Sequence, residues 1–148
     1  MKKTQSKSGF TLIEVLIVIS IIGVLSSLTL LGLGTFRASG RDVKRITDLR
    51  QITNALELYY AKVGNYPDAL TGLLKTANPA GVIDKVPADP TNVAPNVYSY
   101  STCTGGYVVK AVLEEANEKI LAESYVGAQG DGCTVSCAAA SKEYCIKF

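Results

Sequence analysis

The chain begins with a long apolar segment. From Val15 to Phe36, 22 successive residues carry no charge, and most of them are apolar. As an α-helix this segment would be about 33 Å long, enough to cross the hydrocarbon core of a membrane. The sequence therefore predicts a membrane-spanning helix over residues 10–36. A cleaved secretory signal peptide is the alternative, but the apolar run is longer than such signals need.

The pattern changes after residue 36. Apolar residues now recur every three or four positions, while charged residues, Arg45 and Asp48 among them, are expected on other faces. This spacing predicts an amphipathic continuation of the same helix to residue 63, ended by Gly64 and the "NYP" that follows it. The recurring apolar positions are Val43, Ile46, Leu49, Ile52, Leu56, Tyr59 and Val63.

The remainder of the chain predicts a loop and a small sheet. Residues 64–97 hold all five prolines and predict a loop, with a short helix around Leu70, Leu73 and Leu74 that packs on the long helix. Strands are predicted at 97–101 and 106–114, as an antiparallel hairpin, and at 144–148, while 114–125 is either a short helix or a polar excursion. The predicted fold class is α+β, a long N-terminal helix packed by its second half on a small antiparallel sheet.

The length of the chain limits the number of its domains, and its charge limits the kinds of partner it can attract. At 148 residues the chain has room for one apolar segment and one compact domain. The formal net charge is +2, and three of the positive charges, Lys2, Lys3 and Lys7, precede Gly9. The rest of the chain is nearly neutral, so general attraction to nucleic acid is not indicated.

All four cysteines lie in the last third of the chain, at Cys103, Cys133, Cys137 and Cys145. Two disulfides are favoured, because this region would be exported if the apolar segment crosses a membrane. A zinc site is the alternative, but paired C-x-x-C knuckles and histidines are missing from the sequence. Three pairings remain open. We favour Cys103–Cys133 with Cys137–Cys145, because Cys133 and Cys137 bridge each other only with difficulty if that stretch is helical.

Glu14 is a carboxylate inside the apolar run. Such a charge costs about 2.5 to 3.5 kcal/mol on membrane insertion scales, so it usually marks a functional partner. Between Lys7 and Arg37 the sequence has no basic residue. The available cation would be an α-amino group created by cleavage. A cut after Gly9 would place that amine on Phe10, four positions from Glu14 and on the same helical face.

The segment "FTLIEVLIVISIIGVL" after a short basic leader resembles the class III leader and N-terminal helix of type IV pilins and of the major pseudopilins of type II secretion. The "VPADPTN" at 86–92 is similar to the helix-to-sheet connection of the major pseudopilins. The resemblance implies that a prepilin peptidase cuts between Gly9 and Phe10 and N-methylates Phe10, and that Glu14 is the assembly carboxylate. It also implies a homopolymer, built by an inner-membrane platform and a separate motor ATPase.

The resemblance divides the chain into a leader (1–9), a membrane and assembly helix (10–36) and an exported head (37–148). In the secretion branch a C-terminal loop binds calcium, but between Gly127 and Phe148 this chain offers only Asp131 and Glu143. We therefore expect no metal or other cofactor. The sequence also lacks a phosphate-binding loop, a nucleophile elbow and any histidine, so we expect no enzymatic activity.

Three functions are consistent with the sequence. The first is a subunit of a type IV pilus-type filament, held in the inner membrane as a single-pass precursor and then displayed at the cell surface. The second is the major pseudopilin of a periplasmic filament for secretion or DNA uptake. The third is a membrane-tethered ligand-binding module, which would not need the arrangement of Gly9, Phe10 and Glu14.

Overall fold

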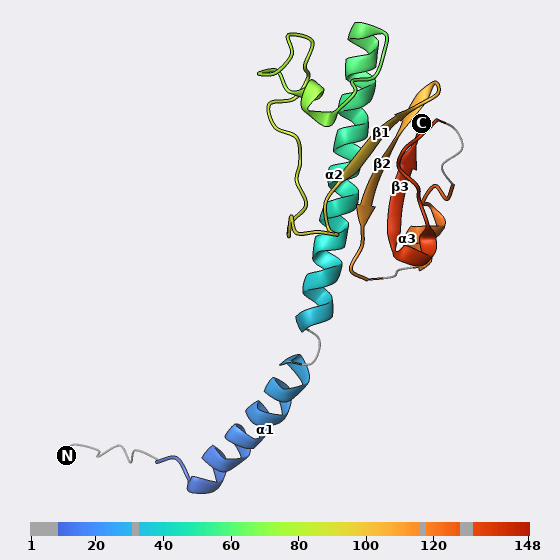
Figure 1. Cartoon of the computed structure of the whole chain (residues 1–148). Coiled ribbons are helices and arrows are strands. Elements are labelled where there is room, and N and C mark those ends of the chain that lie inside the picture. Colours follow the sequence, from blue (N-terminus) through green and yellow to red (C-terminus); the bar gives the residue numbers. More distant parts are fainter. Residues whose placement is uncertain (1–8, 31–32, 116–117, 128–131) are drawn as a thin grey trace, which may run out of the picture. The chain divides into compact units, whose positions relative to one another are not determined.

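The computed structural model describes residues 9–30, 33–115, 118–127 and 132–148. The chain forms two units, Met1–Arg37 and Ala38–Phe148, each considered by itself. The first contains α1 (Leu12–Leu30), and α2 (Leu33–Val63) runs on into the second (Figure 1). In the described ranges, none of the helices combines the length and apolarity that crossing a membrane requires. Most of the expected leader and the junction at 31–32 lie outside these ranges.

The second unit, which we call the head, is built on α2. The predicted stop of this helix is confirmed, since α2 ends at Val63 and Gly64 follows with a φ of 81°. A positive φ favours glycine because it lacks a Cβ. The backbone N–H of Gly64 donates to the carbonyl of Tyr60 at 2.7 Å and completes the last turn.

The sheet has three antiparallel strands in the order β1-β2-β3: β1 (Ser99–Cys103), β2 (Gly106–Val112) and β3 (Glu143–Lys147). Val109 is central, facing Tyr100 on β1 and Ile146 on β3. The predicted hairpin and final strand are confirmed, with boundaries shifted by one or two residues.

One hydrophobic core joins α2 to the sheet. Leu49, Ile52 and Leu56 come from the helix, Tyr107 and Val109 from β2, and each is completely buried. The periodic spacing on α2 and the alternation along β2 bring these side chains together. This arrangement confirms the α+β class, in which the helix packs on the sheet through its second half (Figure 1).

The segments outside the sheet are short. The predicted helix near residue 70 is a 3-10 turn, η1 (Leu70–Leu73), and the buried carbonyl of Leu73 accepts the N–H groups of Val82 and Ile83. Of the two interpretations for 114–125, the short helix is correct, as α3 (Glu118–Ala122). A second 3-10 turn, η2 (Ala139–Ser141), precedes β3.

Candidate processing and assembly site

The predicted cleavage point lies in open, non-helical chain. Gly9 and Phe10 precede the start of α1 at Leu12, and the Phe10 side chain is 83 % exposed. A Cβ built on Gly9 would meet no atom within 4 Å. Because the Gly9–Phe10 peptide bond is neither helical nor covered, a peptidase has direct access to it in the described chain.

Glu14 forms a capping box with Thr11. One carboxylate oxygen, Oε2, accepts the Thr11 backbone N–H at 2.8 Å and the Thr11 hydroxyl at 2.7 Å. The Glu14 N–H in turn donates to Thr11 Oγ1 at 3.4 Å. These contacts satisfy N–H groups that the first helical turn leaves unpaired. Sequence reasoning missed Thr11, although the Thr-x-x-Glu spacing was readable.

The capping box brings the Glu14 carboxylate to the amide of Thr11, one residue beyond the nitrogen of Phe10. In the uncut chain that Phe10 nitrogen belongs to a peptide bond and carries no charge. The carboxylate therefore lies one residue from the nitrogen of the predicted cleavage point. The pairing of Glu14 with a Phe10 amine remains a prediction.

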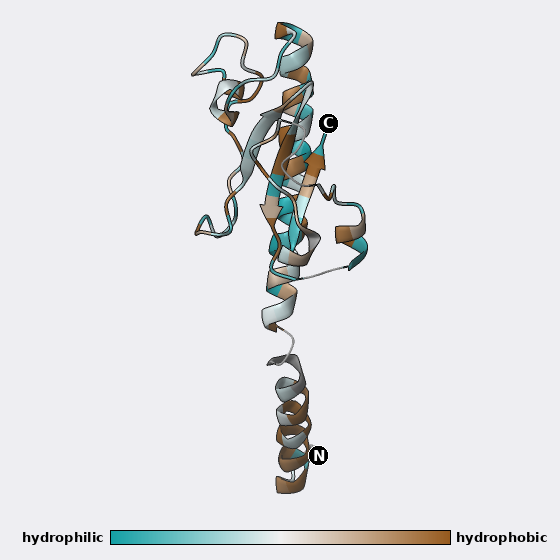
Figure 2. Ribbon diagram, turned by 45° about the vertical axis from the view of Figure 1, so that its right-hand side comes forward, coloured by the Kyte–Doolittle hydropathy of each residue, from teal (hydrophilic) through white to brown (hydrophobic). Residues whose placement is uncertain are grey.

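The helix that follows is apolar on every side. All large apolar side chains from Leu12 to Leu25 are at least 49 % exposed, and Figure 2 shows α1 as predominantly hydrophobic along its length. A helix with this pattern is stable only when lipid or other helices surround it.

The head contains a buried ion cluster that the sequence did not reveal. Arg45 was expected on a face of the helix away from the apolar residues, which a charged side chain would normally expose, but its side chain is completely buried. Its guanidinium donates to Asp89 at 2.6 Å, to Asp42 at 2.7 Å and to Glu114 at 2.7 Å. Arg41 also pairs with Glu114. A buried cation needs such partners, so the cluster joins α2 to two distant segments.

Two of the acidic partners, Asp89 and Glu114, have lowered pKa values and are held in their charged forms. Burial alone would raise the pKa of Asp89, but hydrogen bonds from Arg45, Thr91 and the Asn92 backbone outweigh it and keep this pKa far below its usual range. The hydrogen bond from Arg41 lowers the pKa of Glu114 to about 2, against the opposing effect of burial and with Arg45 adding to it. Asp89 belongs to the Pro-Ala-Asp-Pro turn, so this turn is fixed to α2 by charge.

Asp48 was also expected on a solvent face and is buried instead. Its carboxylate accepts the Tyr98 hydroxyl at 2.8 Å. The apolar spacing along α2 could not place Arg45 or Asp48, because their partners Asp89, Glu114 and Tyr98 lie 44 to 69 residues further along the sequence.

Two disulfides fasten the C-terminal segment to the outer face of the sheet. Cys103 is bonded to Cys133, and Cys137 to Cys145. These are the pairs favoured from the sequence. On this face Val108 forms a second buried cluster with the Cys137–Cys145 disulfide. The head therefore has three layers: α2, the sheet and the disulfide-tied segment.

Of the two carboxylates considered as calcium ligands, only Glu143 lies within the described residues. Asp131 lies outside the described residues. Glu143 accepts the Lys110 amine at 2.9 Å and the Ala138 N–H at 2.8 Å, so both of its oxygens serve the fold.

Comparison with known proteins gives consistent matches. The model of the prokaryotic N-terminal methylation motif matches residues 4–30. The type II secretion system core protein G of Vibrio cholerae is 33 % identical over 111 residues, which cover 68 % of this chain and 74 % of that protein. The core protein G of Escherichia coli is 33 % identical over 102 residues, covering 61 % and 70 %. That of Pseudomonas aeruginosa is 31 % identical over 112 residues, covering 65 % and 74 %. No solved structure matches the chain.

Proposed function

The chain belongs to the family of the type II secretion core protein G, the major pseudopilins, and is a pilin-like filament subunit; we propose that it is the main subunit of a periplasmic pseudopilus. The observation that carries this proposal is the match to core protein G, which extends well beyond the N-terminal motif into the head. Members of this family are structural subunits, so we infer that the function of the chain is to assemble into a filament.

Processing is the first step of the proposal. A prepilin peptidase removes residues 1–9 and N-methylates Phe10. The exposed, non-helical peptide bond after Gly9 supports this step. The nitrogen of Phe10, neutral in the peptide bond, then becomes a charged amine. It lies one residue before the Thr11 N–H that the Glu14 carboxylate already binds.

Assembly is the second step. The amine of Phe10 pairs with Glu14 of a neighbouring copy and fixes the axial offset between the two helices. Four residues of helix correspond to a rise of about 6 Å, which is the offset that this pairing sets between adjacent helices. The exposed apolar side chains of α1 supply most of the cohesion, because once the helix has left the membrane only other copies keep this apolar area out of water.

A membrane stage precedes the filament. The uncharged run from Val15 to Phe36 has the length that a spanning segment needs, and we propose that it holds the precursor in the inner membrane. The head then lies on the exported side, where its disulfides form. Because the sequence has no nucleotide-binding motif, a separate ATPase acting through an inner-membrane platform drives the transfer into the filament.

A cell-surface pilus is the second candidate. The disulfide-tied segment favours it, because two covalent links replace the acidic loop expected of the secretion branch. Such links keep a head folded outside the cell, where calcium and pH vary.

The test uses the native cells. Surface filaments are sheared off, and the N-terminal mass of the chain is measured in the sheared and membrane fractions. We expect a chain that begins at N-methylated Phe10 and is retained with the cell envelope. The same processed chain as the main protein of sheared filaments would establish the pilus instead. A chain that begins at Met1 in both fractions would contradict both.

A Glu14→Ala variant tests the assembly step in the same cells. We expect processing to continue and the head to keep its disulfides, while incorporation into filaments is lost. Filaments of wild-type abundance from this variant would remove Glu14 from the assembly mechanism.

A further inference from the structure

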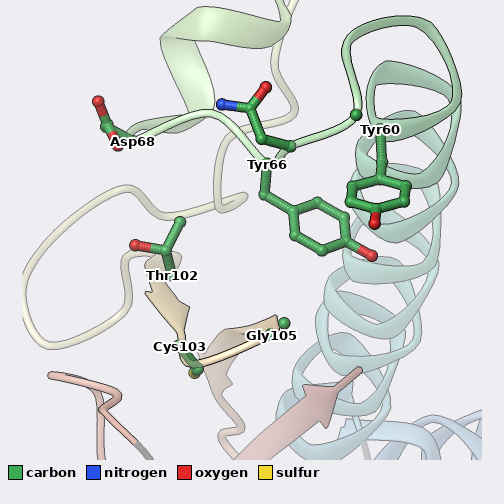
Figure 3. A pocket seen from close by; sticks show the side chains of 9 residues that line it. Tyr60, Tyr66, Asp68, Thr102, Cys103 and Gly105 are labelled. Atoms are coloured by element: carbon green, nitrogen blue, oxygen red, sulfur yellow. The ribbon is translucent and has the colours of Figure 1, made fainter.

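Two hollows on the described head differ in the charges that they offer. One lies where the end of α2 meets the hairpin of β1 and β2, measures about 360 Å³ and has Tyr60 and Tyr66 side by side in its wall (Figure 3). The Asp68 carboxylate points away from these rings, so the two kinds of group do not converge. The other hollow, which we call the lysine pocket, measures about 320 Å³. It lies between α2 and the loop before β1 and is lined by Lys44, Asp48, Gln51, Lys85, Pro87 and Ala88.

The lysine pocket attracts an anion. Lys44 and Lys85 are both exposed, and neither forms an ion pair with the described residues. Asp48 is the one carboxylate in the described lining, but it is buried and accepts the Tyr98 hydroxyl at 2.8 Å. Two amines against one engaged carboxylate leave the pocket positive, so a carboxylate from outside the head would be attracted by both amines.

An exposed carboxylate lies on the other flank of α2. The backbone N–H of Glu115 donates to Asp42 at 2.8 Å, which holds Glu115 at the level of residue 42 on the helix. Its side chain is exposed and has no ion-pair partner in the described part of the chain. Each residue turns a helix by about 100°, so Asp42 and Lys44 point about 160° apart.

The face of α2 that packs on the sheet separates the two groups. Leu49 and Ile52, both in the core, lie between Asp42 and Lys44 around the helix. The loop before β1 and the segment after β2 accordingly run on opposite sides of α2 (Figure 1). Glu115 and the lysine pocket therefore do not meet within one copy.

The proposed assembly step brings the two flanks to the same level. The pairing of Phe10 with Glu14 of a neighbour shifts one copy along the other by four helical positions, about 6 Å. All copies of a helical filament are related by the same shift, so the heads are displaced equally. Where α2 runs along the filament, residue 42 of the shifted copy reaches the level of residue 46 of its neighbour. That level lies within the lysine pocket, between Lys44 and Gln51.

Other exposed carboxylates of the head fit the lysine pocket less well. Asp84 already pairs with Lys75 at 3.1 Å. Asp68 follows the end of α2 at Val63, far from the level that a shift of four positions brings to the pocket. Glu118 belongs to α3, which contacts β3, the strand of the sheet farthest from β1 and the loop before it.

We propose that Glu115 of one copy inserts into the lysine pocket of the next copy, where its carboxylate pairs with Lys44 and Lys85. The two surfaces differ, so the contact is head-to-tail, and such a contact extends into an open helical filament when it does not close on itself. Val43 and Leu58, exposed on the α2 face between the two flanks, then face the filament interior, where other copies cover them.

This contact rests on the proposed function and adds to it a determinant of head orientation. The pairing of Phe10 with Glu14 sets the axial shift, and the pairing of Glu115 with the lysine pocket sets the rotation of each head against its neighbour. All three charged side chains of the contact are exposed in the single chain, so reversing them leaves the fold of the head intact.

The test is a charge exchange in the full chain, expressed in the native cells. Glu115→Lys places three amines together at every contact, and we expect it to lower filament mass about tenfold or more. Adding Lys44→Glu and Lys85→Glu to this variant reverses the polarity of the contact and should recover filaments. The control adds Arg50→Glu and Lys62→Glu to Glu115→Lys, which gives the same net charge outside the pocket, and should not recover them. Each variant should still be processed and keep both disulfides, which separates a loss of assembly from a loss of folding.

Carbodiimide cross-linking gives an independent measurement. Wild-type filaments grown from mixed ¹⁴N and ¹⁵N subunits should yield peptides in which Glu115 of one isotope is linked to Lys44 or Lys85 of the other. Linkage of these lysines to another envelope protein instead would show a different occupant and overturn the contact. Filaments without the mixed-isotope linkage would also overturn it.

The variants give two further ways to contradict the contact. Wild-type filament mass in Glu115→Lys would overturn it, as would failure of the charge exchange to recover filaments. In both cases the wild-type filament still forms, so the proposed function stands while the contact fails. If the wild-type chain forms no filament, the proposed function fails first, and the contact fails with it.

Discussion

The two units of this chain differ in how exposed their side chains are and in where those side chains find their bonding partners. In α1 every large apolar residue described is at least about half exposed, and the polar groups bond within their own helical turns, as Ser20 and Ser27 do to carbonyls three or four positions earlier. In the head, buried charges and apolar residues find partners from distant segments. The buried side chains of the head are thus explained by contacts within the head, whereas the apolar surface of α1 is the pattern of a helix surrounded by lipid or by other helices.

The largest effect should come from breaking the buried ion cluster. In the variant Arg45→Met, three carboxylates lose their shared cation, and we expect the free energy of unfolding of the head to fall by about 3–5 kcal/mol. Chemical denaturation of the detergent-solubilised chain measures this. The control Arg50→Met, at an exposed position of the same helix, should change it by no more than about 0.5 kcal/mol. Equal effects of the two changes would show that the cluster does not stabilise the head.

A matched pair of leucine variants tests the comparison directly. Leu49→Ala leaves a cavity in the core between α2 and the sheet and should cost about 2–5 kcal/mol of unfolding free energy. Leu16→Ala removes the same atoms from α1, where the side chain is half exposed. In the solubilised chain, we expect the head to unfold as in the wild type. If Leu16→Ala destabilised the head, the two units would not be independent.

The sequence predicted what depends on local pattern. Periodicity placed the core face of α2 at Leu49 and Leu56, and the helix ends before Gly64 as predicted. Periodicity did not predict the burial of Arg45, because it assumes that every charged side chain faces solvent. The partners Asp89 and Glu114 are brought to Arg45 by the tertiary fold. The sites show the same division. Glu14 stood out as a charge in an apolar run, but the ion cluster around Arg45 unites α2 with Asp89 and Glu114, which no sequence spacing connects to it.

The two disulfides should differ in their contribution. Cys103–Cys133 closes a loop of 30 residues and Cys137–Cys145 one of 8. From loop entropy alone, removing the first should cost about 3.6 kcal/mol and removing the second about 2.5 kcal/mol. Alanine pairs at each bridge, compared by denaturation, measure the difference, and non-reducing peptide mass spectrometry checks the pairing. A linked peptide joining Cys133 to Cys137 would contradict the arrangement described above.

Acid should weaken the head through Glu114. Its pKa is lowered from 4.5 to about 2, chiefly by the hydrogen bond from Arg41. Because the folded pKa lies below the unfolded one, this stabilisation is complete above pH 4.5 and is lost as the pH falls through 2. Unfolding free energies measured from neutral pH down to this range should decrease, and Glu114→Gln should flatten the decrease. An unchanged pH profile in Glu114→Gln would mean that other groups cause the loss.

The smallest expected change distinguishes two roles of Glu14. Thr11→Val removes the two hydroxyl contacts of the capping box and keeps the one from the backbone N–H, and it should cost α1 about 1 kcal/mol of helix stability, seen as slightly lower helicity of the solubilised chain. If Glu14 served only as a helix cap, Thr11→Val would impair filaments as strongly as Glu14→Ala does. We expect filaments from Thr11→Val and none from Glu14→Ala, because the carboxylate remains free to bind the Phe10 amine of a neighbour. Loss of the hydroxyl contacts should then leave assembly intact, since α1 is stabilised mainly by the copies around it.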